Sequence, residues 1–169
     1  MPYFAVALAR KGGRWTGQEI DLDDVEDLDG VTDTLRDMIS DGGGPALMFL
    51  EENDEYMLAV RVDGVDDDAD PRSFISDIRA VESSELAAKL YDVVTPEPAL
   101  DLDDDDDEES AAKPEGEPGG DDTIAVDLGT PSGELLDLCN EEGNLPADII
   151  YAVCERAGCG DLLEELRGG

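Results

Sequence analysis

Apolar residues in the first 95 positions gather in short runs that acidic or glycine-rich breaks separate. Runs of four to eight residues, continuous or alternating with polar ones, predict strands, whereas apolar residues spaced three and four apart predict one face of a helix. The predicted strands are 3–10, 14–20, 46–52, 55–62 and 72–77. The predicted helices are 30–40 and 83–94, the second with Ser83 or Ser84 as its N-cap.

Turn residues connect these runs in a way that indicates the fold class. Gly12 and Gly13 separate the first two strands, and Asn53 and Asp54 separate the third from the fourth, so both pairs are predicted hairpins. The order is strand, strand, helix, three strands, helix. It predicts an α+β fold with a five-stranded antiparallel sheet and two helices, which cover at least one face of the sheet.

The composition changes after the second predicted helix. Pro96 and Pro98 end that helix, and residues 96–122 are nearly all Asp, Glu, Pro, Gly, Ala and Ser. Ordering a residue costs roughly 1 to 2 kcal/mol of conformational entropy, and this segment has too little apolar surface to offset that cost. We therefore predict a disordered linker. Apolar residues at helical spacing return in 123–169, which we predict to form a small all-α module. Because such short helices are marginal alone, we expect the module to dock either on the sheet domain (1–95) or on a partner.

Charge narrows the choice of partner. The 169 residues include 46 acidic and 11 basic side chains, for a net charge of −35. Phosphate backbones and anionic membrane surfaces repel such a chain, so we expect no direct binding of nucleic acid and no membrane binding. The expected partner is a basic protein surface or a cation, and the alternative is that the acidity serves solubility alone.

Two further features predict a cytoplasmic protein. No run approaches the ~18 apolar residues of a membrane-spanning helix, and the first basic residues follow the N-terminal apolar stretch, unlike those of a secretory signal. The three cysteines, Cys139, Cys154 and Cys159, are odd in number and lack paired spacing, as expected of reduced thiols.

Side chains that carry common enzyme chemistry are scarce. The chain has no histidine, the commonest general base, and too few ligands for a tetrahedral zinc site. An EF-hand loop aligned on Gly30 would put Val25 at the first position and Arg36 at the twelfth, where calcium binding requires carboxylates. We therefore expect a non-catalytic protein without a cofactor or a metal.

Three polar side chains and one acidic run are candidates for partner binding. Arg61 lies in a strand between acidic neighbours, and Ser76 and Asp77 end the fifth strand, so together they are a candidate polar patch at one sheet edge. The alternative for these three is an ion pair or a turn cap. The acidic run comprises Asp103, Asp104, Asp105, Asp106 and Asp107 within DLDDDDDEES. We expect it to act mainly as a self-repelling tether, with electrostatic capture of a basic partner as a second role.

The competing hypothesis is a small enzyme or ligand-binding domain with a pocket between the sheet and the helices. Its working groups would be carboxylates such as Glu51, Glu52 or Glu55. A deep pocket that holds inward carboxylates with strongly raised pKa values would favour this hypothesis, whereas a packed sheet face would count against it.

Several segments together resemble one known family. They are YFAVALAR near the start, ENDEYMLAVRV at 52–62, FISDIRA at 74–80 and DLGTPSGELLDLCNEEGNLP at 127–146. These segments resemble the actinobacterial tRNA adenosine deaminase-associated proteins. The resemblance implies an association, chiefly of neighbouring genes, with the enzyme that converts adenosine to inosine at the tRNA wobble position. The chain lacks that enzyme's His-x-Glu and Pro-Cys-x-x-Cys signature.

The order of strands and helices is also similar to that of profilin-like or longin-like sheets, which often serve as interaction scaffolds. The leading hypothesis is a non-catalytic cytoplasmic accessory protein that docks on a basic protein surface. The resemblance implies tRNA adenosine deaminase, or a factor near it, as its partner.

Overall fold

The computed structural model describes residues 3–39, 44–52, 55–63, 71–90, 118–141 and 143–168. Its strands are β1 (Tyr3–Lys11), β2 (Arg14–Glu19), β3 (Ala46–Glu52), β4 (Tyr56–Val62), β5 (Arg72–Ile75) and β6 (Gly119–Gly120). Its α-helices are α1 (Leu28–Met38), α2 (Ala80–Ser83), α3 (Glu85–Leu90), α5 (Ser132–Asn140), α6 (Pro146–Ala157) and α7 (Gly160–Gly168). Two single 3-10 turns are η1 (Leu22–Asp24) and η2 (Val126–Leu128).

The strands form one antiparallel sheet in the order β2-β1-β3-β4-β5-β6. The antiparallel α+β class is confirmed, but the prediction of five strands was wrong. The sixth strand, β6, comes from a stretch that was assigned to the linker, and its two glycines pair with Phe74 and Ile75. A Cβ on Gly120 would lie 2.4 Å from the carbonyl oxygen of Ser73, so only glycine allows this close approach.

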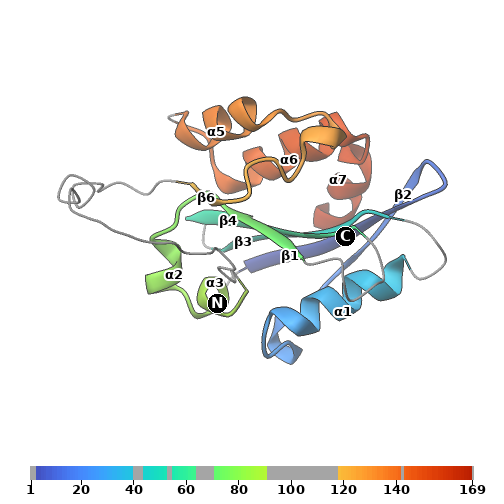
Figure 1. Cartoon of the computed structure of the whole chain (residues 1–169), viewed down its shortest axis with the longest axis horizontal. Helices are drawn as coiled ribbons and strands as arrows, with labels where there is room; N and C mark the ends of the chain where they lie inside the picture. The colour runs from blue at the N-terminus through green and yellow to red at the C-terminus, as the bar shows by residue number, and fades with distance from the viewer. Residues whose placement is uncertain are drawn as a thin grey trace.

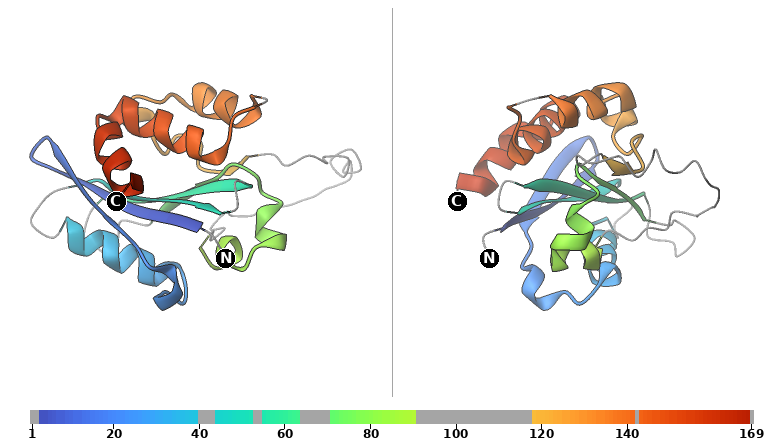
Figure 2. Two further views of the ribbon diagram at one scale, coloured as in Figure 1. Left: turned by 180° about the vertical axis from the view of Figure 1, so that it is seen from behind. Right: turned by 90° about the vertical axis from the view of Figure 1, so that its left-hand side faces the viewer.

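Helices cover both faces of the sheet, as Figures 1 and 2 show. Helices α1, α2 and α3 lie on one face, and η2, α5, α6 and α7 lie on the other. Successive residues of the central strands enter different cores, because side chains of a strand alternate between its faces. Met48 and Leu58 pack on the α1 side, whereas Phe49 and Met57 pack on the α6 side. The central strands are therefore buried on both faces.

The second predicted helix, 83–94, corresponds to α3, and an additional short helix that was not predicted, α2, lies directly before it. The backbone of Ser84 is extended and separates them. Its Oγ accepts a hydrogen bond from the N–H of Ala87 at 3.2 Å, so Ser84 is the N-cap of α3. Residues 91–94 of the predicted helix lie outside the described residues.

The C-terminal helices dock on the sheet of the same chain. Trp15 on β2 donates a hydrogen bond from Nε1 to the carbonyl oxygen of Ala157, at the end of α6, over 3.0 Å. Gly17 on β2 leaves room for α7, because a Cβ there would lie 2.9 Å from a methyl group of Leu166. Residues 91–117, which contain most of the predicted linker, lie outside the described residues. Across the described ranges, no helix has the length and apolar character that crossing a bilayer requires.

Candidate functional site

Arg61, a predicted partner-binding residue, is buried between β4 and the C-terminal half. Its side chain is 4% exposed. Nη1 and Nη2 donate to the two carboxylate oxygens of Asp127 over 2.6 and 2.8 Å, and Nη1 also donates to the carbonyl oxygen of Ile124 over 2.7 Å. Nε donates to Asp63 over 2.8 Å. Arg61 therefore joins the central sheet to the segment before α5.

The ion pairs continue beside Arg61. Arg72, which is opposite Arg61 in the β4–β5 register, contacts Asp63 over 3.2 Å and Asp121 over 3.3 Å. The pKa of Asp127 is lowered, mainly by the hydrogen bonds that Arg61 donates to it. Burial raises the pKa of Asp121, but hydrogen bonds from Thr123 and the charge of Arg72 outweigh burial, and the pKa is lowered.

The other predicted binding residues lie elsewhere. Ser76 is hydrogen-bonded to the main chain of Met57, at the start of β4, whereas Arg61 lies near its end. Asp77 accepts a hydrogen bond from the main-chain N–H of Arg79 over 2.9 Å and closes a turn before α2. The structure therefore does not bring Arg61, Ser76 and Asp77 into one patch. Asp103, Asp104, Asp105, Asp106 and Asp107 lie outside the described residues.

The carboxylates of the competing hypothesis do not share a pocket. Glu51 and Glu52 are both buried, but as neighbours on β3 they point to opposite faces of the sheet. Glu51 accepts a hydrogen bond from Arg167 over 2.6 Å. Glu52 accepts hydrogen bonds from Tyr56 over 2.8 Å and from Ser84 over 2.5 Å. Glu55 is exposed in the turn after β3.

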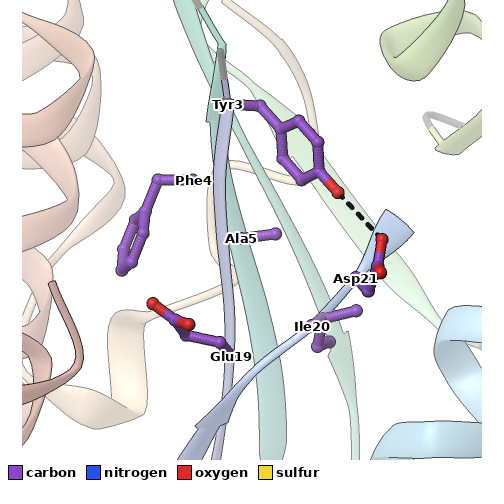
Figure 3. A pocket seen from close by; sticks show the side chains of 6 residues that line it. All are labelled: Tyr3, Phe4, Ala5, Glu19, Ile20 and Asp21. Atoms are coloured by element: carbon purple, nitrogen blue, oxygen red, sulfur yellow. Dashed lines mark hydrogen bonds between the residues drawn. The ribbon is translucent and has the colours of Figure 1, made fainter. Parts of the chain in front are cut away.

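A pocket opens at a different place, where β2 leaves the sheet. We call it the edge notch (Figure 3). It has a volume of about 470 Å³ and is lined by Tyr3, Phe4, Ala5, Glu19, Ile20 and Asp21. The notch exists because β1 is nine residues long and β2 only six. The last main-chain hydrogen bond between the first two strands runs from the N–H of Ile20 to the carbonyl oxygen of Ala5. The carboxylate of Asp21 then accepts a hydrogen bond from the N–H of Asp23, and η1 begins.

The two sides of the edge notch differ in chemistry. On one side, the hydroxyl of Tyr3 donates to Asp21 over 3.4 Å and accepts from the N–H of Leu22 over 2.9 Å. Burial raises the pKa of Tyr3, and the nearby charges of Asp23 and Asp21 add to this effect. Phe4 and Glu19 are both on the other side of β1 (Figure 3).

An arginine of the same chain already contacts this second side. The guanidinium of Arg167 lies 4.6 Å from the centre of the Phe4 ring while it donates to Glu51. Phe4 and Glu51 are directly opposite each other in the β1–β3 register. An aromatic ring beside a carboxylate is a combination that holds a guanidinium by stacking and charge.

No residue of the edge notch was predicted from the sequence. The usable signal was Asp21, a turn residue directly after the second predicted strand. In the parts of the chain that the structure describes, no group of three or more Cys, Asp or Glu side chains is arranged to hold a metal ion.

The sheet, its two helical layers and the edge notch define a mixed α+β protein with an open pocket at one edge of its sheet. The chain belongs to the Rv3753c-like tRNA adenosine deaminase-associated protein family, whose family model matches residues 3–160. This match confirms the family that the sequence segments resembled. Comparison with curated proteins and with solved structures found no match.

Proposed function

We propose that this chain is a non-catalytic accessory protein that binds tRNA adenosine deaminase through charge complementarity. The observation that carries the proposal is the net charge of −35 in a chain whose family is associated with that enzyme. Several of the 11 basic side chains are also neutralised by carboxylates of the same chain. The arginines that pair with carboxylates of this chain are Arg61, Arg72, Arg79, Arg156 and Arg167.

The chemistry of the proposed partner supports this choice. An enzyme that binds tRNA must present basic side chains to the phosphate backbone. A strongly acidic protein is attracted to the same surface, and opposite potentials speed association and suppress wrong partners. The accessory protein would then either protect the free enzyme or compete with tRNA for it. The three free thiols agree with a cytoplasmic location, where such thiols stay reduced.

The non-catalytic part of the proposal rests on how the buried carboxylates are used. Arg167 holds Glu51, and Tyr56 with Ser84 holds Glu52. A carboxylate with these fixed partners on a packed sheet face is not positioned to exchange protons with a bound substrate. The chain also has no histidine to act as a general base.

Co-elution of the purified chain with the tRNA adenosine deaminase of the same organism tests the proposal. We expect a complex at low salt whose affinity falls by about tenfold or more as ionic strength is raised to screen the charges. An unrelated protein of similar net charge is the control, because it separates specific docking from general attraction. Absence of a complex at every ionic strength, or equal binding of the control protein, would contradict the proposal.

The acidic run needs a separate test because it lies outside the described residues. Replacement of Asp103 to Asp107 by asparagine removes five charges and leaves β6 intact. If the run captures the deaminase, affinity at low salt falls and the salt dependence becomes shallower. If the run is only a tether, both quantities stay unchanged.

A further inference from the structure

We propose that the edge notch binds an arginine side chain of a basic partner protein. The inference rests on the proposed function for the identity of that partner, but the binding chemistry follows from the notch itself. The guanidinium would stack on the part of the Phe4 ring that Arg167 leaves uncovered and pair with Glu19, which lies on the same side of β1 as Phe4 (Figure 3).

The backbone of β1 leaves polar groups directed into the edge notch. Ala5 bonds to Ile20 on the β2 side, and hydrogen bonding in an antiparallel strand alternates between its two neighbours. Tyr3, two residues earlier, therefore directs its N–H and C=O toward the space that β2 has left. No described residue pairs with these two groups. An extended segment of a partner beside Tyr3 would satisfy them by adding a short piece of strand.

The volume of the edge notch fits this mode of binding. About 470 Å³ is within the range of roughly 300 to 1,000 Å³ that ligand pockets usually have. A single side chain does not fill such a space. The arginine and the main chain on either side of it would occupy the notch together.

Charge explains why the occupant is a cation. Six of the nine residues from Glu19 to Asp27 are acidic, and none is basic. Glu19 and Asp21 are exposed at the rim of the notch, and the charges of Asp23 and Asp21 add to burial in raising the pKa of Tyr3. The field in the notch therefore attracts positive charge before contact is made.

Arg167 shows that Phe4 accepts a guanidinium beside a carboxylate. Its partner carboxylate is Glu51, on the β3 side of the ring. Glu19 offers the equivalent group on the β2 side, because it is opposite Val6 in the register and shares the face of Val6 and Phe4. Arginine fits better than lysine, because a planar guanidinium stacks on a ring and donates to a carboxylate at the same time, whereas an ammonium is a point charge.

The experiment is a titration of the full, isotopically labelled chain followed by NMR. The probe is the blocked tripeptide Gly-Arg-Gly, and the control probe is the same peptide with citrulline, which keeps the shape and loses the charge. We expect saturable shifts at the amides of the edge notch with the arginine peptide only. Glu19→Gln should weaken this binding by about tenfold, the typical contribution of one charge-assisted hydrogen bond.

Two matched variants separate the notch from the general acidity of the chain. Asp21→Asn keeps an acceptor for Asp23 and removes the charge, so it should weaken binding by a smaller factor than Glu19→Gln. Glu26→Gln removes an exposed charge from the same acidic segment but does not line the notch, so affinity should stay within about twofold. Equal weakening by Glu26→Gln, equal shifts with citrulline, or shifts that never saturate would overturn the inference.

The same variants distinguish this inference from the proposed function. If the chain binds the deaminase and Glu19→Gln leaves that affinity unchanged, the accessory function stands and the notch is not its contact. If the arginine peptide binds at the notch and the deaminase does not bind the chain, the notch takes an arginine from another basic protein and the proposed function fails.

Discussion

Arg61 on β4 and Asp127 in η2 are 66 positions apart in the chain and form two parallel hydrogen bonds, over 2.6 and 2.8 Å. Bidentate pairs of this kind fix geometry as well as charge. The same guanidinium also holds the carbonyl oxygen of Ile124. This contact fixes the start of the C-terminal half on a central strand, and the helices that follow cover that face of the sheet.

Replacement of Arg61 by methionine should lower the stability of the chain. Methionine keeps much of the buried volume but leaves Asp127 and the Ile124 carbonyl without their donor. We expect the free energy of unfolding in urea to fall by about 2 to 3 kcal/mol, below the range for fully buried pairs because the Asp127 side chain is 60% exposed. Arg79→Met is the control, because its pair with Asp77 is exposed and should contribute less than about 1 kcal/mol. Equal effects of the two variants would contradict the role of Arg61.

Acid should weaken the same contact. The pKa of Asp127 is lowered in the folded chain by its hydrogen bonds to Arg61, so it lies below the value of about 3.9 for an unfolded aspartate. The contribution of Asp127 is therefore present above about pH 4 and is lost as the pH falls through the folded pKa. Asp127→Asn should be less stable than the wild type at neutral pH, and the difference should close below pH 4.

A double-mutant comparison checks that Arg61 is the cause of this pH dependence. In the Arg61→Met background, Asp127→Asn should change the free energy of unfolding very little at any pH, because the donor is already gone. A pH-dependent difference that persists in this background would assign the effect to another group. Urea unfolding at a series of pH values measures both variants.

The elements that could be predicted best are those in which every residue is buried. Strands β3 and β4 are apolar along most of their length because helices cover both of their faces, and such runs are visible without a structure. The N-cap at Ser84 was one of the two predicted for the second helix, because a serine before an apolar helical pattern signals a helix start. What the local sequence does not indicate is the short helix α2 before Ser84, or the hydrogen bond from the Ser84 hydroxyl to Glu52 on the distant strand β3.

The site was harder to predict than the fold. Arg61 was recognised as unusual, but nothing near it in the sequence identifies Asp127 as its partner. The edge notch depends on where β2 leaves the sheet, and strand ends are the least certain part of a sequence-based assignment. Two glycines carry no apolar signal, so β6 could not be recognised.

Trp15 should report whether the sheet and the C-terminal helices unfold together. It is the one tryptophan of the chain, and its indole N–H bonds to the end of α6 while its backbone belongs to β2. Because both layers share a core, we expect the urea transitions of Trp15 fluorescence and far-ultraviolet circular dichroism to coincide. A fluorescence transition at lower urea would mean that the helices leave the sheet first. Trp15→Phe, which loses the hydrogen bond and part of the packing area of the indole, should cost about 1 to 2 kcal/mol.

Salt should stabilise this chain, in contrast to its effect on a chain held together by exposed ion pairs. With 46 acidic and 11 basic side chains, repulsion among like charges opposes the compact state, and added ions screen it. Raising NaCl from about 0.01 M to about 1 M shortens the screening length from about 30 to about 3 Å, so the free energy of urea unfolding should rise over this range. Choline chloride at the same ionic strength should act equally if screening is the cause. A larger effect of sodium would indicate specific cation binding, and a fall in stability with both salts would show that attractive pairs outweigh the repulsion.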